Sequence, residues 1–277
     1  MGENFTPVRA GLRWARPLAT AVVKAHFDAR RAGELVIASG GDAREASRVA
    51  DLLGARRGHA APGDVMVGVA APHAANHELA VAVGDHRRAG GEALVVVIGS
   101  PVQRRVIERE LRADRDVGIS VMLMVDALDG ADLVRIRRRV ANMIVSRGEG
   151  LRRDYASLQP DIARQMEHRT ALRVGVRAAL VADAERSATG MKSSHARLAA
   201  DIASITDANF DAKAVGLVAA LGLLAPVWRA GAGRLTALVP FTRIAVRGGI
   251  AYSVTRLVGI GAQRVAAFGR APHQEER

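Results

Sequence analysis

The chain has no cysteine among its 277 residues, and aromatic residues make up only 3% of it. The lack of cysteine excludes disulfides, thiolate metal ligands and a cysteine nucleophile. Proteins that bind single-stranded nucleic acid usually stack the bases on Phe, Tyr or Trp. The scarcity of aromatic residues therefore disfavours that function, and the core must be built from aliphatic side chains.

Acidic side chains are absent from residues 212–274, although this segment carries eight cationic ones. A segment that is both apolar and uniformly positive is poorly suited to ordinary solvated surface. It either packs on the rest of the chain with its arginine heads in water or meets an anionic surface such as a membrane leaflet. The residues predicted to contact that surface are Arg229, Arg234, Arg243, Arg247 and Arg256.

Long apolar runs are also missing. The longest charge-free run considered, residues 214–228, has 15 residues and contains Pro226, whereas a membrane-spanning helix needs about 18 or more. The first 31 residues have no apolar run followed by a cleavage site, so a secretory signal is not expected. These patterns predict a cytoplasmic protein that associates peripherally with the inner membrane.

Strand-length apolar runs recur in the first half, at residues 34–39, 64–71, 92–100 and 119–127. Stretches with helical spacing follow them, at residues 42–55, 77–90, 102–114 and 132–145. Buried strands that alternate with helices are typical of a parallel sheet covered on both faces. We predict a basic helix in residues 1–33 and a small doubly wound, Rossmann-like α/β domain in residues 34–146.

Strand patterns stop after residue 150, and the chain is predicted to be all-α over residues 151–270, with a tail at 271–277. A helix break is expected near Pro160. A helix over 193–207 would begin at a Ser193 cap, and apolar helices are expected at 213–228, 234–246 and 249–268. Glycines at positions such as Gly248 and Gly249 would separate these last helices.

The loop after the first strand holds Gly40, Gly41 and Asp42, and a helix follows it. A phosphate-binding loop would carry a lysine after its last glycine, and that lysine is missing here. A tight turn with a helix cap is the favoured interpretation, and the loop is at most a vestigial nucleotide site. The alternative is a weak nucleotide-binding regulator or NTPase.

Three other groups could carry chemistry, and each has a simpler structural interpretation. Ser100 and the nearby Arg104 could bind an anion, but Pro101 favours a plain helix start. The pair His73 and His77 lacks a third ligand nearby, so neither a metal nor another cofactor is predicted. Further along, Ser193, Ser194 and His195 suggest a helix cap rather than a nucleophile. The side chains predicted to form a solvated helix face are Asp161, Glu167 and His168.

Residues 92–100 followed by 121–144 resemble the last two strands of a translation-factor-type GTPase domain. Where that family reads the base with Asn-Lys-x-Asp, this chain has Gly99-Ser100-Pro101-Val102. The second of these strands ends in Ser-Ala-Leu/Lys in that family, and this chain keeps only Ala127 and Leu128 of that motif. The resemblance implies a degenerate GTPase-like domain that has lost the residues for binding and hydrolysing GTP.

The second half resembles the bacterial domain-of-unknown-function family 697, which often follows such a GTPase domain. The matching pieces are residues 169–180, 195–214 and 239–262. The resemblance implies a helical domain associated with or adjacent to a membrane, and it supplies no catalytic residue.

Together these patterns predict a non-catalytic membrane-associated, adaptor or regulatory protein. Its expected partners are an anionic membrane surface or a membrane protein, and a GTPase is a possible partner. The net charge of +12 leaves open nucleic-acid binding by bulk charge, which would depend steeply on salt and show no sequence preference. No specific nucleic-acid target is predicted.

Overall fold

The computed structural model describes residues 20, 33–40, 43–147, 157–180, 184–206 and 243–268. The chain divides into two compact units, of which one comprises residues 30–162 and the other residues 1–29 and 163–277. We call them the α/β unit and the helical unit. The basic helix expected before residue 33, the helix expected at 213–228 and the tail lie outside the described residues, as does most of the helix expected at 234–246.

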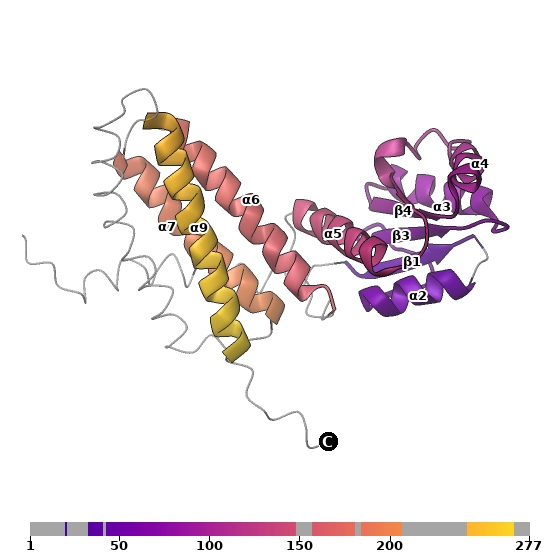
Figure 1. The fold of residues 1–277 in the computed structure, drawn as a ribbon, viewed down its shortest axis with the longest axis horizontal. Coiled ribbons are helices and arrows are strands. Elements are labelled where there is room, and N and C mark those ends of the chain that lie inside the picture. Colours follow the sequence, from indigo (N-terminus) through magenta and orange to yellow (C-terminus); the bar gives the residue numbers. More distant parts are fainter. Residues whose placement is uncertain are drawn as a thin grey trace, which may run out of the picture. The chain divides into compact units, whose positions relative to one another are not determined.

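Strands and helices alternate along the α/β unit (Figure 1). The elements are β1 (Leu35–Ser39), α2 (Ala43–Leu53), β2 (Arg56–Arg57), β3 (Val65–Ala70), α3 (Asn76–Arg88), β4 (Glu92–Ile98), α4 (Pro101–Leu111), the 3-10 turn η1 (Ile119–Val121), β5 (Met122–Val125) and α5 (Gly130–Arg147). This order confirms the predicted α/β class. The prediction missed β2, and it extended the last strand over residues that form η1.

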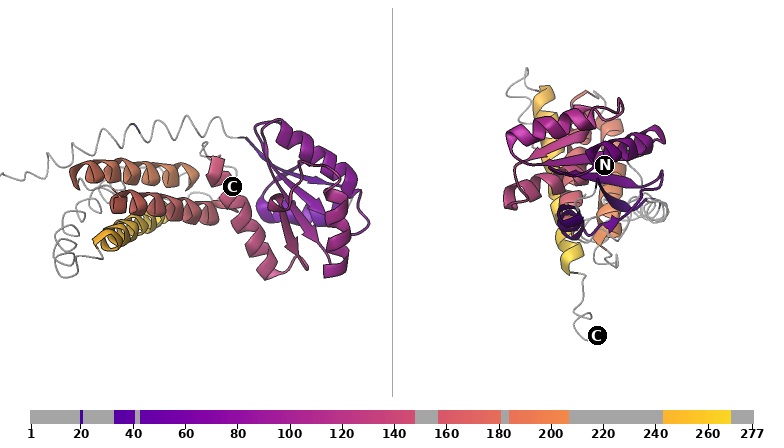
Figure 2. Two further views of the ribbon diagram at one scale, coloured as in Figure 1. Left: turned by 90° about the horizontal axis from the view of Figure 1, so that it is seen from above. Right: turned by 90° about the vertical axis from the view of Figure 1, so that its right-hand side faces the viewer.

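The five strands form one parallel sheet with the order β2-β1-β3-β4-β5. Crossovers between parallel strands are right-handed. The step from β1 to β2 runs in the opposite direction to the later steps, so α2 lies on one face while α3 and α4 lie on the other. The last helix, α5, shares the face of α2 (Figure 2). Every residue of β3 is buried, because helices cover both faces there.

Three long helices form the described part of the helical unit: α6 (Gln159–Leu180), α7 (Ala184–Thr206) and α9 (Arg243–Phe268). The first turn of α6 belongs to the α/β unit, whose range ends at Ile162. The three helices lie side by side (Figures 1 and 2). Together with the sheet, they confirm the predicted combination of an α/β domain and a helical part.

Three predicted helix boundaries in this region are wrong. Pro160 stands in the first turn of α6, where its missing N–H costs nothing, so it starts a helix instead of breaking one. Ser193 lies inside α7, nine residues after the helix begins, so it is no cap. Gly248 and Gly249 lie inside α9, which continues through them.

The first of these two glycines in α9 has a packing role. A β-carbon at Gly248 would stand 3.1 Å from the carbonyl oxygen of Gly175 in α6, and one at Gly175 would stand 3.0 Å from the carbonyl oxygen of Gly248. The two helix backbones therefore touch at this crossing. Close contact here compensates for the low helix propensity of glycine.

Candidate functional site

Parallel sheets bind ligands beyond the carboxyl ends of their strands, at the point where the order in which the strands are connected reverses. In this sheet the switch lies between β1 and β3, and Gly40 follows β1 there. The backbone N–H of Ala75 donates a hydrogen bond to the carbonyl oxygen of Gly40. A β-carbon at Gly40 would stand 2.3 Å from the carbonyl oxygen of Ala75. The loop after β3 thus packs on Gly40, and the remaining loop residues, Gly41 and Asp42, lie outside the described residues.

The neighbouring loop, after β4, forms a helix cap. Ser100 Oγ accepts a hydrogen bond from the backbone N–H of Gln103 at 3.4 Å, and the Gln103 side chain accepts one from the Ser100 N–H at 2.9 Å. This reciprocal pair is a capping box, and Pro101 follows it at the helix start. Arg104 forms an ion pair with Asp126 at 2.7 Å. The structure therefore confirms the predicted helix start at Pro101, and it adds the capping role of Ser100.

The two histidines considered as a metal pair lie at the start of α3. His73 belongs to the loop after β3 and has a φ of 69°, and His77 is the second residue of α3. Among the described residues, no group of three or more His, Cys, Asp or Glu side chains could hold a metal ion.

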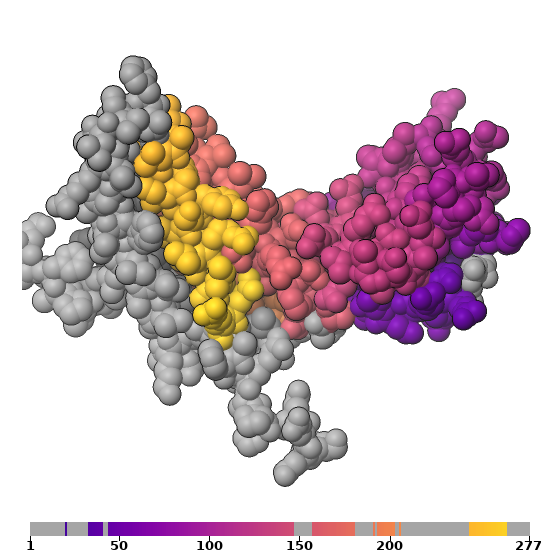
Figure 3. All heavy atoms as spheres, in the orientation of Figure 1, coloured from indigo at the N-terminus to yellow at the C-terminus, as the bar shows by residue number. Residues whose placement is uncertain are grey.

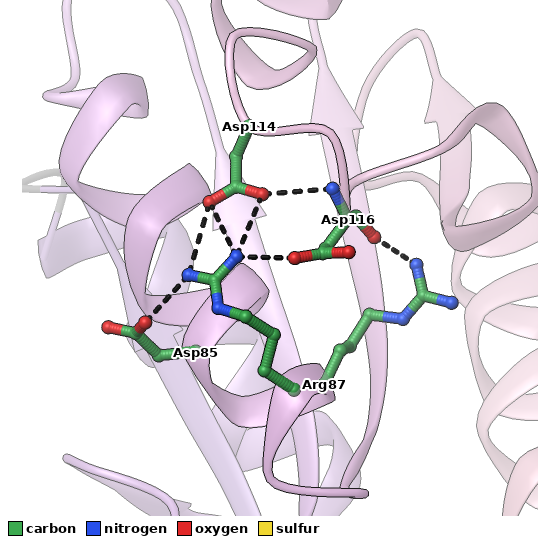
Figure 4. Close-up of polar contacts among 5 residues, drawn as sticks. Asp85, Arg87, Asp114 and Asp116 are labelled. Carbon is green, nitrogen blue, oxygen red and sulfur yellow. Dashed lines mark hydrogen bonds and ion pairs between the residues drawn. The ribbon is translucent and has the colours of Figure 1, made fainter.

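Arg88, the last residue of α3, is the centre of a surface cluster of charges that includes Asp85, Asp114 and Asp116, which Figure 4 labels. Arg88 contacts Asp85 at 2.7 Å and Asp114 at 3.3 Å, and it also pairs with Asp116. A β-carbon at Gly84 would stand 2.4 Å from the Asp114 carboxylate, so this glycine makes room for the cluster. Hydrogen bonds to Asp85 and then Asp116 raise the pKa of Arg88. The cluster joins α3 to the segment after α4, and its charges are satisfied.

The helical unit, by contrast, holds a carboxylate in its interior. Glu167 of α6 is only 2% exposed, although it was expected on a solvated face. It forms an ion pair with Arg256 at 2.9 Å and accepts a hydrogen bond from Gln263 at 3.0 Å, both from α9. Burial raises the pKa of Glu167, while Arg256 and the Gln263 hydrogen bond oppose that rise. A β-carbon at Gly259 would stand 2.3 Å from Glu167 Cγ, so α9 has a glycine where Glu167 enters.

A second buried polar contact joins α7 to α9. The ring Nε2 of His195 lies 2.8 Å from Thr255 Oγ1, whose hydroxyl donates to the carbonyl oxygen of Ala251 at 2.8 Å. The hydroxyl proton is thus committed, so neutral His195 donates from Nε2. Burial lowers the pKa of His195 to about 4. This pairing gives His195 a packing role, and Ser193 and Ser194 lie inside α7.

The outer side of α6 carries a repeated pattern of arginine and exposed aliphatic residues. Leu172, Val176 and Leu180 are 53%, 50% and 76% exposed. The residues three positions before them are Arg169, Arg173 and Arg177. Residues three apart are neighbours on a helix surface, so two adjacent stripes result, one cationic and one apolar. We call this surface the α6 stripe.

The inner side of α6 explains the orientation of the stripe. Val174 and Ala178 are buried and pack with Ala251 of α9. The space-filling view shows α6 and α9 as neighbouring strips on one face of the helical unit (Figure 3). Arg173 and Arg177 are both exposed, and neither has an ion-pair partner among the described residues.

The five arginines predicted to contact an anionic surface lie in different settings. Arg229 and Arg234 are outside the described residues. Arg243 is the first residue of α9, and Arg247 stands one turn later and is half-buried. Arg256 differs from the expectation, because its guanidinium pairs with the buried Glu167 and is 34% exposed.

The arginines of the α6 stripe were not among the predicted contacts. That prediction rested on a segment without acidic residues, and α6 contains acids such as Asp161 and Glu167. The spacing of three between each arginine and the next aliphatic residue was the signal that could have identified the stripe.

No protein-family model, curated protein or solved structure matches this chain. Among the described residues, no helix is long and apolar enough to cross a membrane.

Proposed function

We propose that this chain is a non-catalytic adaptor that binds reversibly to an anionic membrane surface through its helical unit. The α6 stripe carries the proposal. The solvent-facing side of α6 has a row of aliphatic side chains beside a row of arginines. Helices that lie in the membrane interface have this composition.

The charge of the helical unit supports the same function. Residues 163–277 contain 16 cationic and 8 acidic side chains. One of those acids, Glu167, is buried against Arg256 and cannot neutralise the surface. Arg264 is exposed near the end of α9 and adds to the cationic surface. Each cation at an anionic leaflet contributes about 1 kcal/mol, so several of them together suffice for reversible attachment.

In this proposal the α/β unit is a vestigial GTPase-like domain, which presents a surface to a partner instead of turning over a nucleotide. The packing of Ala75 on Gly40 supports this, because the chain itself fills the space beside the first glycine of the loop. Attachment of the helical unit to a membrane then places the α/β unit at the inner leaflet.

Vesicle co-sedimentation tests the proposal. The variant Arg173→Glu/Arg177→Glu reverses two cations of the α6 stripe, and Arg105→Glu/Arg109→Glu reverses two exposed cations of α4 with the same spacing and the same change in net charge. We expect binding to phosphatidylglycerol-containing vesicles to fall about thirtyfold in the first variant, because at least about 2 kcal/mol is lost. The α4 variant should keep most of its binding.

Two results would contradict the proposal. If the wild-type chain binds neutral phosphatidylcholine vesicles as well as anionic ones, charge does not direct the attachment. If both double variants lose binding equally, only the overall charge matters and the α6 stripe is not the binding surface.

A further inference from the structure

The outer edge of β1 is only partly covered by β2. All five residues of β1 pair with β3, whereas only Val36 and Ile37 pair with β2 on the other side. After β2 the chain turns away from β1 at Gly58, which has a φ of 139°, a conformation that glycine adopts far more readily than other residues. Within the described part of the chain, Ala38 and Ser39 therefore have no strand beside them on the outer edge.

Backbone hydrogen bonds show which way Ser39 faces. In a parallel sheet, the N–H and C=O groups of one strand residue point to the same neighbouring strand, and those of the following residue point to the other one. The carbonyl oxygen of Glu34 accepts from the Val65 N–H at 2.8 Å, on the side of β3. The carbonyl oxygen of Ile37 accepts from the Gly58 N–H at 3.1 Å, on the outer side. The N–H and C=O of Ser39 thus also point outward, and neither has a hydrogen-bond partner among the described residues.

A hollow of about 650 Å³ adjoins this open edge, and Ala38 and Ser39 line it from β1. Its other walls come from both helix layers, since Ala46 lies on α2 and Leu79 and Ala82 lie on α3. Because α2 and α3 cover opposite faces of the sheet, the hollow lies at the level of the sheet itself. That is the position of the next strand in a sheet. The volume falls within the range of ligand sites, roughly 300–1,000 Å³.

The loop between β2 and β3, residues 58–64, forms the outer wall of the hollow, where Ala60 lines it. This loop is held in place by Asp64, which is buried. The two carboxylate oxygens of Asp64 accept hydrogen bonds from the backbone N–H groups of Glu34 and Ala61, each at 2.7 Å. The loop cannot move onto the edge of β1 without breaking these bonds, so the edge stays open in the folded chain.

The free backbone groups of Ser39 indicate what the hollow binds. An extended peptide offers an acceptor and a donor at the spacing that an unpaired strand residue needs, and peptides often bind by adding a strand to a sheet edge. Successive side chains of such a peptide point to opposite faces of the sheet. Here they would meet Ala46 on one face, and Leu79 and Ala82 on the other, all of them aliphatic. An extended segment with small aliphatic side chains therefore matches both the backbone groups and the lining.

We propose that the open edge of β1 binds an extended aliphatic segment of a partner protein, which pairs with the backbone of Ser39 and fills the hollow. The segment lies beside β1, beyond the end of β2. This role of the α/β unit rests on the proposed function, in which that unit presents a surface to a partner. Peptide binding is measured without vesicles, so a failure of the peptide site and a failure of membrane attachment are separate results.

Calorimetry on the full chain with the capped peptide Ac-Lys-Val-Ala-Val-Lys-NH2 tests the main-chain pairing. Five further versions of this peptide each carry one N-methyl group, at successive residues. Methylation of the N–H that donates to the Ser39 carbonyl should weaken binding about two- to tenfold, the effect of one hydrogen bond. Methylation at the residues on either side should weaken it less, because their N–H groups point away from β1. A similar loss at every position, or no loss at any, would contradict the pairing.

Two variants of Ser39 place the pairing on β1. Ser39→Pro removes the outward N–H, which no described residue uses, and an edge strand accepts proline where its N–H faces away from the sheet. Ser39→Ala changes the side chain only. We expect the affinity for the peptide to fall about two- to tenfold in Ser39→Pro and to stay unchanged in Ser39→Ala.

A steric pair tests the hollow even if Ser39→Pro does not fold. Ala82→Trp puts an indole into the hollow, whereas Val81→Trp, its neighbour on α3, changes a residue that is 41% exposed and does not line the hollow. We expect the affinity to fall more than tenfold in the first variant and to stay unchanged in the second. The proposal is overturned if the peptide does not bind at millimolar concentration, or if folded Ser39→Pro or Ala82→Trp binds it like wild type.

Discussion

The two units use an arginine-rich composition in opposite ways. Residues 30–162 carry 20 cationic and 18 acidic side chains, against 16 and 8 in residues 163–277. In the α/β unit, arginines pair with carboxylates at the surface, as Arg88 and Arg104 do, and the strands of the core are apolar. In the helical unit a carboxylate pairs inside, between Glu167 and Arg256. Because Glu167 is buried, its charge is not available to the outer surface, where Arg173 and Arg177 have no ion-pair partner among the described residues.

The difference also concerns how each fold is specified. Apolar strands in the α/β unit pair in one register through their backbone hydrogen bonds. Helices rich in Ala and Gly have no such guide, since one small side chain packs much like the next. We infer that the Glu167–Arg256 pair sets the register of α6 on α9, and that the His195–Thr255 bond sets that of α7 on α9. Buried polar pairs can supply specificity of this kind even where they add little stability.

Acidification should cause the largest difference in stability between the two units. Burial holds the pKa of His195 at about 4, against an ordinary value of 6.5. Between these pH values the unfolded chain binds a proton that the folded chain does not, so the free energy of unfolding decreases as the pH falls from 6.5. At pH 4 the loss is on the order of 3 kcal/mol. Above pH 6.5 this residue makes no pH-dependent contribution.

Hydrogen exchange followed by mass spectrometry at a series of pH values from 7 to 4, corrected for the intrinsic exchange rate, measures this loss unit by unit. Protection of α9 should decrease on acidification before that of β4. In His195→Asn, which keeps an N–H donor and removes the titrating ring, the decrease should be weaker. If β4 and α9 lose protection in parallel in the wild type, the two units do not differ in this respect.

Removing the buried carboxylate should be the next largest effect. Glu167→Ala leaves Arg256 without its partner in a site that is 34% open to solvent. Breaking a buried pair costs about 3–5 kcal/mol, and the solvent access of Arg256 reduces this to about 2 kcal/mol. The surface counterpart, Asp126→Ala, removes a carboxylate that is 77% exposed and should cost less than about 1 kcal/mol.

Urea unfolding curves of both variants check this order, with hydrogen exchange to locate the affected unit. Equal losses in the two variants would contradict the distinction between an internal and an external pair.

The sequence predicted the α/β unit better than the helical unit, for physical reasons. The runs that became β3 and β4 are buried on both faces, so every residue in them had to be apolar, apart from Glu92 at the start of β4. The edge strand β2 consists of two exposed arginines, and nothing in a hydrophobicity pattern indicates it. Its existence follows only from pairing with β1.

The polar residues of the helical unit show what a single sequence cannot reveal. Glu167 stands among arginines on α6, which is typical of a solvated face. It is buried because Gly259, 92 positions later, leaves space for it. The matching arginine, Arg256, was predicted from its charge to lie on the outer surface. Only the packing of α6 on α9 joins these three residues, whereas the helix start at Pro101 depends on neighbours in sequence and was predicted.

The smallest effect uses two adjacent glycines to measure the closeness of the helices. Alanine has a higher helix propensity than glycine by about 1 kcal/mol. A β-carbon at Gly249 would meet open space, so Gly249→Ala should raise the free energy of unfolding by about that amount. At Gly248 a β-carbon would stand 3.1 Å from the Gly175 carbonyl oxygen and 3.2 Å from the Ala179 β-carbon. The two helices must then separate slightly, and Gly248→Ala should gain nothing or lose stability. Thermal or urea unfolding of the two variants gives the difference directly. Equal stabilisation by both alanines would mean that α6 and α9 do not touch at this crossing.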